Sequence, residues 1–399
     1  MLAGVAAVGM ITLTPASPGP RLPVWCLTCG DRPAVDALLN VLLFLPLAVG
    51  MGLCRVGFRR ALLFGALGSI LIESLQATVV AGRFPSGRDV LANSLGAAVG
   101  YLIGSGLTTL VRPQPRAARS LALGAAAAWL VTQAFTAWAM GIAAPPTPWW
   151  AQLRPEYDEY PAVFAGTVVR ASIGSLPIDE SDEISRGDEA RRELLNGAPV
   201  SAVLTGVRPT IARALVMVIT AGPVYEAAYW EQEGTDAVFT VPVRGTFAGL
   251  RTPSVRLAGA MRANARDTVT LRGIYAHGRY HLTAVHGRAV VVRDLAASPS
   301  FLWAFLLPIP MYAFGSEVHA VTALWIACIW LLFGYWGARA IGSARRAQIF
   351  AASAATLCLG LAMAPVLFGV PPSHWSEWVA GVGGFAGGWA FARFVLARE

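Results

Sequence analysis

The chain contains no lysine and has few charged residues of any kind. Only 14% of its 399 residues are Asp, Glu, Lys or Arg, whereas soluble domains average about 25%, and 55% are hydrophobic. All 31 basic residues are therefore arginine, which indicates first a GC-rich coding sequence and second a selection for guanidinium groups. The scarcity of charge excludes an ordinary soluble enzyme, and we expect most of the chain to lie in lipid.

Recognisable catalytic and metal-binding motifs are also absent. The sequence has no Gly-x-Ser-x-Gly, no His-Glu-x-x-His and no Gly-rich phosphate loop, so it favours neither an enzyme nor a cofactor or metal site. Cys26 and Cys29 form a Cys-x-x-Cys pair, but zinc would need two more ligands; a disulfide is the first interpretation and two free thiols the second. Cys54, Cys328 and Cys358 fall in apolar stretches, where we expect buried thiols.

Eight apolar stretches are long enough to predict transmembrane helices. The first is short, but it lacks the basic start and the cleavage site of a signal peptide, so we interpret it as an anchor. A further apolar stretch at 299–315 contains Pro308 and Pro310 and is interpreted as a helix lying on the outer interface. The eight predicted spans are 1–16, 35–54, 61–81, 90–110, 120–143, 319–338, 348–369 and 376–396.

Arginine is concentrated in the short loops after the second, fourth and sixth predicted spans. By the positive-inside rule these loops face the cytoplasm, which puts both termini inside and residues 145–297 outside. The net charge of +8 belongs to this pattern, and no basic patch with interleaved aromatics points to nucleic acid as a partner. The loop arginines are Arg55, Arg59, Arg60, Arg112, Arg116, Arg119, Arg339, Arg345 and Arg346.

Residues 145–297 are the most polar part of the chain and predict a separate water-soluble domain. Short runs rich in Val, Thr and aromatic residues alternate there with Gly and Pro, which is typical of an antiparallel β-sandwich or jelly roll. Ala276-His277-Gly278 predicts a hairpin loop, and 179–196 either a short surface helix or a loop. The predicted strands are 162–170, 199–206, 214–220, 237–243, 254–259, 268–275, 279–285 and 289–293.

Polar side chains recur inside the second to fourth predicted spans, where each needs a reason. They form three pairs, each on one helical face, and two arginines precede the third pair. One interpretation is a structural network of interhelical hydrogen bonds; the other is a pocket that binds a polar head group at the outer leaflet, with arginine forks suited to phosphate or carboxylate. These candidate ligand-binding residues are Asp36, Asn40, Glu73, Gln76, Arg83, Arg88, Asp89 and Asn93.

Four segments resemble the VanZ-like family of bacterial membrane proteins. They are TLTP (12–15), DALLNVLLFLPLAVG (36–50), SILIESLQ (69–76) and GRFPSGRDVLANSLGAAVGY (82–101), so the resemblance covers about 1–110, with a mild departure at Ala48 where the family has Gly. The resemblance implies a multi-pass plasma-membrane protein, and its best-known member is linked to low-level teicoplanin resistance. The residues it nominates are Asn40, Glu73, Gln76, Arg83, Asp89 and Asn93.

The inserted domain is similar, in its strand spacing, to concanavalin-like and laminin-G-like sandwiches. This similarity implies carbohydrate binding through aromatic residues and a calcium site in an acidic loop. Such aromatics are more often core or membrane-belt residues, and such acidic loops are more often simply solvated. The candidates are Trp149, Trp150, Tyr225, Tyr229 and Trp230 for sugar and Asp179, Glu180, Asp182 and Glu183 for calcium.

The sequence thus predicts an α-helical integral membrane protein of about eight helices with an inserted all-β extracytoplasmic sandwich. Its expected units are 1–110, a fifth span and linker at 111–144, the sandwich at 145–297, and a C-terminal part at 298–399. The favoured function is binding of polar head groups or glycans on a membrane lipid or lipid-linked envelope precursor. The alternatives are an enzyme acting on such a precursor with Glu73 as acid or base, and a transporter.

Overall fold

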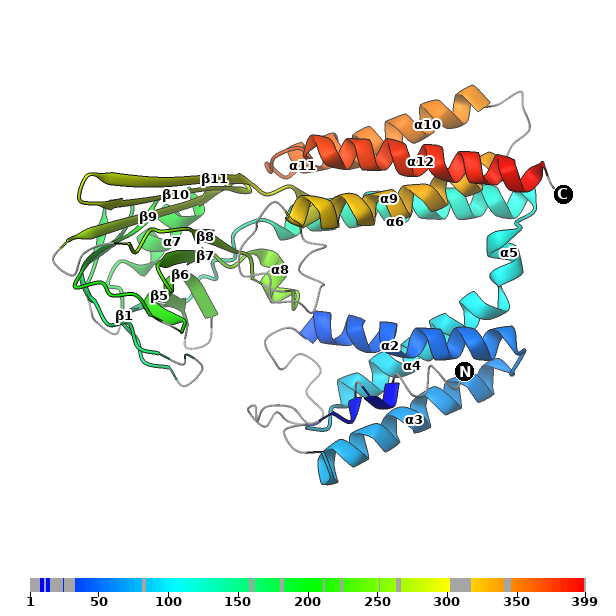
Figure 1. The fold of residues 1–399 in the computed structure, drawn as a ribbon, viewed down its shortest axis with the longest axis horizontal. Coiled ribbons are helices and arrows are strands. Elements are labelled where there is room, and N and C mark those ends of the chain that lie inside the picture. Colours follow the sequence, from blue (N-terminus) through cyan, green and yellow to red (C-terminus); the bar gives the residue numbers. More distant parts are fainter. Residues whose placement is uncertain are drawn as a thin grey trace.

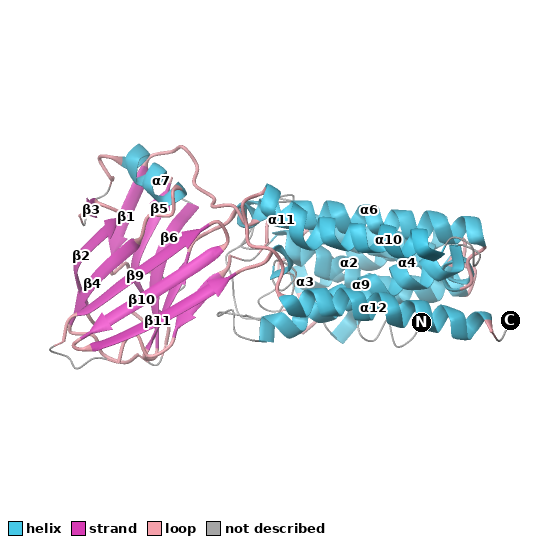
Figure 2. Cartoon of the chain, turned by 90° about the horizontal axis from the view of Figure 1, so that it is seen from above, coloured by secondary structure: helices cyan, strands magenta, loops and turns pink. Residues whose placement is uncertain are grey.

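The computed structural model describes residues 8–10, 12–14, 24, 33–80, 84–157, 160, 162–179, 183–210, 212–222, 225–250, 252–262, 267–301, 317–340 and 346–397. Long helices lie side by side, and the β-strands gather at one end of them (Figure 1; Figure 2). Several predicted features lie outside the described residues: the Cys26–Cys29 pair, Arg83, Glu180, Asp182 and the interfacial helix beyond Phe301.

Six helices among the described residues are long and apolar enough to cross a membrane, and they coincide with six of the eight predicted spans. The fourth predicted span is also helical, as α4 (Gly87–Ser105) followed by α5 (Leu107–Val111), but the polar residues of α4 keep it out of this group. The first predicted span lies mostly outside the described residues, so the count of eight is not confirmed. The six are α2 (Pro33–Leu53), α3 (Phe58–Thr78), α6 (Pro115–Ala139), α9 (Glu317–Ala340), the run of α10 (Arg346–Cys358), η3 (Leu359–Met363) and α11 (Ala364–Leu367), and α12 (Trp375–Leu396).

The helices run alternately between two ends, which we name the sandwich end and the far end (Figure 1). The α2–α3 connection, the α4–α6 connection and the end of α9 all lie at the far end. These are the three arginine-rich regions of the sequence, and the described residues of 54–57 and 106–114 include no acid. The fold therefore gathers the arginine loops at one end, opposite the sandwich.

Glycine permits the closest helix contacts. On α4, Gly96, Gly100 and Gly104 recur every four residues, and a Cβ on Gly100 would lie only 2.4 Å from the carbonyl oxygen of Leu45 on α2. On α12, a Cβ on Gly388 would likewise collide with the carbonyl oxygen of Leu331 on α9. Small residues at this spacing let helix backbones approach closely enough for van der Waals packing, which drives association where lipid removes the hydrophobic effect between helices.

Three cysteines of the spans are free thiols with exposed side chains, namely Cys54, Cys328 and Cys358. The prediction that they are buried was wrong. An apolar sequence in a membrane helix does not distinguish a side chain that faces lipid from one that faces another helix, because both surroundings are apolar.

The described residues contain eleven strands in two antiparallel sheets, as expected of an all-β domain; a jelly-roll or concanavalin-like topology is not confirmed. The strand orders are β1-β5-β6-β7-β8 and β11-β10-β9-β4-β2-β3. The sequence analysis missed β1, β3 and β6, and the first predicted strand begins later than expected. The bounds are β1 (Trp149–Leu153), β2 (Thr167–Ile173), β3 (Leu176–Ile178), β4 (Val200–Thr205), β5 (Ala214–Ala221), β6 (Tyr225–Glu233), β7 (Asp236–Thr240), β8 (Ser254–Leu257), β9 (Val269–Ala276), β10 (Arg279–His286) and β11 (Ala289–Ala296).

The two sheets pack face to face around a buried aromatic core. Trp230 on β6 is fully buried, its ring lies 4.7 Å from that of Phe239, and its indole nitrogen donates a hydrogen bond of 3.2 Å to the carbonyl oxygen of Val200 in the opposite sheet. A Cβ on Gly273 of β9 would lie 2.8 Å from both rings. Residue 273 therefore has to be glycine for the sheets to approach this closely.

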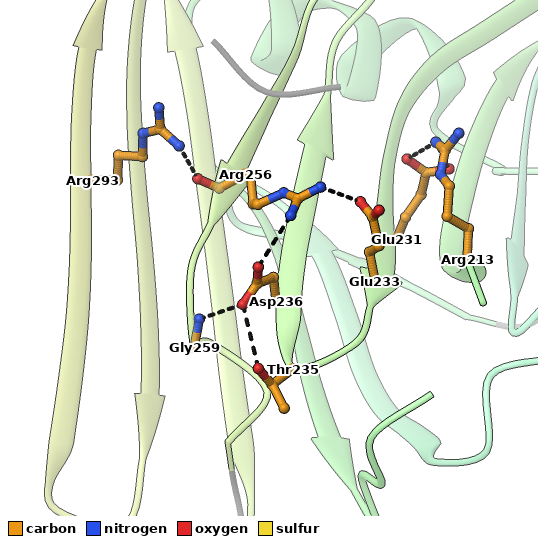
Figure 3. Close-up of polar contacts among 8 residues, drawn as sticks. All are labelled: Arg213, Glu231, Glu233, Thr235, Asp236, Arg256, Gly259 and Arg293. Atoms are coloured by element: carbon orange, nitrogen blue, oxygen red, sulfur yellow. Dashed lines mark hydrogen bonds and ion pairs between the residues drawn. The ribbon is translucent and has the colours of Figure 1, made fainter. Parts of the chain in front are cut away.

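Charged side chains secure the outer edge of the sandwich (Figure 3). On β8, Arg256 pairs with Glu233 at 2.6 Å and with Asp236 at 3.5 Å, while Asp236 also accepts a hydrogen bond of 2.7 Å from the backbone nitrogen of Gly259. Arg293 on β11 donates to the carbonyl oxygen of Arg256 and so links the two sheets. These charges therefore have structural partners within the sandwich.

Two local predictions for the insert agree with the structure. The β9–β10 hairpin turns on His277 and Gly278, which have φ values of 49° and 73°; positive φ at both central positions is the type I′ geometry of two-residue loops. The stretch 179–196 contains a short helix, α7 (Gly187–Leu195), whose Ala190 and Leu194 are buried against the sandwich. The helical alternative for this stretch is therefore the right one.

The sandwich directly contacts α2 and the residue that follows α6. At α8 (Arg244–Phe247) the chain turns at Gly249, whose carbonyl oxygen accepts from the backbone nitrogen of Val35 in α2. On the other side, Tyr275 donates its hydroxyl to the carbonyl oxygen of Met140, just beyond α6. Burial raises the pKa of Tyr275, so its hydroxyl remains a neutral donor at physiological pH.

Candidate functional site

The part of α3 toward the sandwich end presents a column of buried polar side chains toward α4. Ser69, Glu73 and Gln76 are all at most 7% exposed and share one helical face. The Ser69 hydroxyl accepts a hydrogen bond of 2.8 Å from the Asn93 amide on α4, and Gln76 donates one of 2.9 Å to the carbonyl oxygen of Thr12. This column ties α3 both to α4 and to the N-terminal segment.

The start of α4 contributes the second part of the site. Ser86 caps this helix: its hydroxyl accepts from the backbone nitrogen of Asp89, and its own backbone nitrogen donates a hydrogen bond of 2.7 Å to a carboxylate oxygen of Glu73. Arg88 lies between two acids, 3.6 Å from Asp36 on α2 and 3.5 Å from Asp89. Three helices therefore meet through charged and polar groups at the sandwich end.

We name this group the three-helix cluster: Asp36, Ser69, Glu73, Gln76, Arg88, Asp89 and Asn93. It becomes more enclosed from α2 inward, because the side chain of Asp36 is 48% exposed, that of Arg88 is 14% exposed, and Asn93 is 1% exposed. Acceptors outnumber cations among these residues. The arrangement can therefore receive hydrogen bonds from hydroxyl or ammonium groups at Asp36, whose side chain is the most exposed of the three.

The structure brings together six of the eight residues that the sequence proposed. Asn40 lies one turn after Asp36 on α2 and is half-buried, but no described residue hydrogen-bonds to its side chain. Arg83 lies outside the described residues. Ser69 and the capping Ser86 were missed, although Ser69 could have been found because it precedes Glu73 by one helical turn on the same face.

Two buried oxygens of the cluster, Asp89 Oδ1 and Asn93 Oδ1, accept no hydrogen bond from any described residue, although Asp89 Oδ1 lies 3.5 Å from Arg88 Nε. The amide nitrogen of Asn93 is used by Ser69, whereas its amide oxygen is buried and accepts no hydrogen bond from any described residue. Buried polar atoms are normally satisfied, so an orphan at this depth indicates a missing donor.

Residues 10–109 match the VanZ/LLP1 family model. The matched segment contains every member of the three-helix cluster, so the cluster lies in a VanZ-like unit, and the match supports a bacterial cell-envelope membrane protein of VanZ type. It covers about a quarter of the chain and leaves the sandwich and the C-terminal helices outside the VanZ-like unit. Neither a curated protein nor a solved structure matches the chain.

A second polar cluster, which sequence reasoning missed, lies at the start of α12, outside the VanZ-like unit. Glu377 is fully buried and accepts a hydrogen bond of 2.6 Å from the Ser298 hydroxyl. The rings of His319 and His374 stack beside it with centroids 4.1 Å apart. An acid in the first turn of a predicted apolar span was the available signal, since such residues are expensive in lipid.

The structure places some of the sugar candidates in the core of the sandwich, and the described calcium candidates on its surface. Trp149 and Trp230 are fully buried core residues, so they cannot stack on a sugar. Tyr225 is 49% exposed, but its ring packs edge-on against Phe247. Asp179 and Glu183 are exposed, and no group of three potential metal ligands occurs among the described residues.

Proposed function

We propose that the VanZ-like unit binds a polar head group presented at the outer leaflet, through the three-helix cluster. The observation that carries this proposal is the buried amide oxygen of Asn93, which accepts no hydrogen bond from any described residue. A structural network would satisfy its own buried atoms, whereas a binding site leaves some for the ligand. The excess of acceptors favours a head group with hydroxyl or ammonium donors, such as a glycan or an amino group.

The proposed place of action is the cell envelope, on a membrane lipid or a lipid-linked precursor. Protection of such a precursor would connect the VanZ-like unit with resistance to teicoplanin-type glycopeptides. The enzyme alternative would need Glu73 as a proton donor or acceptor, but one of its carboxylate oxygens already accepts from the backbone nitrogen of Ser86. Binding therefore remains the favoured function.

Glu73→Gln is expected to reduce the amount of co-purifying lipid about tenfold or more while lowering the melting temperature little. The amide removes the negative charge that a donor-rich head group would contact, and a charge-assisted hydrogen bond is roughly twice as strong as a neutral one. Its remaining oxygen can still accept from Ser86. The measurement is native mass spectrometry of the purified protein, beside its melting temperature in detergent.

The matched control is Ser74→Ala, because Ser74 is exposed on the same helix and its hydroxyl bonds only to the carbonyl oxygen of Ile70 one turn earlier. Ser74→Ala should change neither the amount of co-purifying lipid nor the melting temperature. The double variant Glu73→Gln with Arg83→Gln separates the interpretations further: a structural ion pair predicts recovered stability, whereas a binding site predicts continued loss of ligand. Normal lipid content in a destabilised Glu73→Gln protein would refute the binding proposal.

We also propose that the far end faces the cytoplasm and the sandwich faces outward, with both termini inside. In a cysteine-free background, a single cysteine at Arg192 on α7 should react in intact cells with a maleimide that cannot cross membranes. A single cysteine at Arg346, at the start of α10, should react only after the cells are permeabilised. The opposite labelling pattern would reverse the proposed orientation.

A further inference from the structure

A cavity of about 220 Å³ lies where the sandwich meets the C-terminal helices. We name it the junction cavity. Its walls come from the end of α6 and the residues after it, the end of α7, the first residue of α8, the β9–β10 hairpin and the chain just after α11. The lining residues used below are Trp138, Gly141, Arg244, Tyr275, His277 and Phe368.

The junction cavity lies at the ends of two candidate spans. Trp138 is the next-to-last residue of the span Pro115–Ala139, and Phe368 directly follows the span Ala347–Leu367. Tryptophan is enriched at this level of a membrane because its ring is amphipathic. A ligand bound here could keep a polar group in the cavity and an apolar chain in the hydrocarbon.

Arg244 is held at the cavity wall by the backbone and by an aromatic ring. Its backbone nitrogen donates a hydrogen bond of 2.7 Å to the carbonyl oxygen of Gly141, which sets the two residues side by side. The guanidinium carbon lies 5.8 Å from the ring centroid of Trp138, a cation–π distance. A Cβ on Gly141 would come within 3.0 Å of that same carbon, so the glycine makes room for the guanidinium.

No described carboxylate lies within ion-pair distance of Arg244, and the described residues that line the cavity include no acid. His277 adds a second basic side chain; it sits at the tip of the hairpin, and its Nδ1 packs near Gly369. Tyr275 is already committed, since its hydroxyl donates to Met140. Among the described lining residues, Arg244 and His277 therefore supply a positioned guanidinium and an imidazole, which together suit an oxyanion.

We propose that the junction cavity binds a phosphate group carried on an apolar chain. The guanidinium of Arg244 contacts the phosphate, His277 supports it, and Trp138 with Phe368 flank the start of the chain. A phospholipid head group and a prenyl phosphate share this chemistry. The site shares no residue with the three-helix cluster and does not depend on its proposed function.

The test is isothermal titration calorimetry on the full chain in a neutral detergent. The probes are dihexanoyl phosphatidylglycerol, farnesyl monophosphate and inorganic phosphate. Arg244→Gln removes the charge, and Gly141→Ala keeps the charge but displaces the guanidinium; each should weaken binding of the lipid probes about tenfold or more. His277→Asn should weaken binding of the lipid probes less than these two changes, because His277 only supports the phosphate. Asparagine tolerates positive φ, so the hairpin turn is preserved.

The matched control is Arg279→Gln, since Arg279 is exposed at the start of β10 beside the same hairpin but does not line the cavity. It should bind both lipid probes as the wild type does, and so should Glu73→Gln. Tighter binding of farnesyl monophosphate would assign a lipid-linked precursor, and tighter binding of phosphatidylglycerol a membrane phospholipid. Equal affinity in wild type and Arg244→Gln, equally tight binding of inorganic phosphate, or no binding of either lipid probe would overturn the proposal.

Discussion

Gly388→Ala is expected to lower the melting temperature of the full-length protein in detergent by roughly 5–10 °C. A Cβ at this position on α12 would lie 2.0 Å from the carbonyl oxygen of Leu331 on α9, and backbone atoms cannot move aside as a side chain can. The helices must separate, which loosens the contacts along the pair, and overpacking of this kind costs about 1–3 kcal/mol. The measurement is thermal unfolding followed by helical circular dichroism.

The control is the neighbouring residue on the same helix. Gly387 is exposed, and a Cβ there would meet nothing within 4 Å. Gly387→Ala should therefore leave the melting temperature unchanged or raise it slightly, because alanine is the better helix former by about 1 kcal/mol. If the two variants melted alike, the close approach of α9 and α12 would be wrong.

Trp230→Ala is expected to lower the free energy of unfolding of the sandwich by about 3–5 kcal/mol. Truncation would leave a cavity between the sheets, remove the contact with Phe239 and leave the carbonyl oxygen of Val200 without its indole donor. The readout is the temperature at which the β-sheet circular dichroism signal of the full chain is lost. The helical signal should be affected much less, since the residue lies within the sandwich.

Tyr225→Ala provides the comparison on the same strand. Tyr225 is 49% exposed and contacts Phe247 edge-on, an interaction worth about 0.5–1.5 kcal/mol. Its loss should shift the same transition far less than Trp230→Ala does. Equal shifts for the two variants would argue against an interior position for Trp230 and against face-to-face packing of the sheets.

The strand β9 shows how a simple burial period makes an element predictable from the sequence. In β9, buried and less buried residues alternate strictly from Val269 to Ala276, and the strand was predicted. In β6 the pattern fails because Glu231 is fully buried through its ion pair with Arg213 at 2.5 Å. The partner lies just before the neighbouring strand β5, so the sequence of β6 alone reads as a polar loop.

In the candidate site, too, the sequence did not predict contacts between different helices. Spacing alone placed Glu73 with Gln76 and Asp89 with Asn93, because residues three or four apart share a helical face. It could not show that Arg88 reaches Asp36 on α2, since that contact depends on how the helices pack. Arg244 was not proposed at all, because its position beside Gly141 depends on a chain crossing between segments about 100 residues apart.

The contact between Gly249 and the start of α2 mechanically couples the sandwich to the VanZ-like unit. Val35 is fully buried in the same apolar core as the sandwich, and Asp36, the next residue, is paired with Arg88. A tilt of the sandwich against the membrane would therefore rotate the first turn of α2 and change the separation of this ion pair. We expect an antibody that displaces the sandwich to change the rate at which lipid leaves the three-helix cluster, and an unchanged rate would show that the two units move independently.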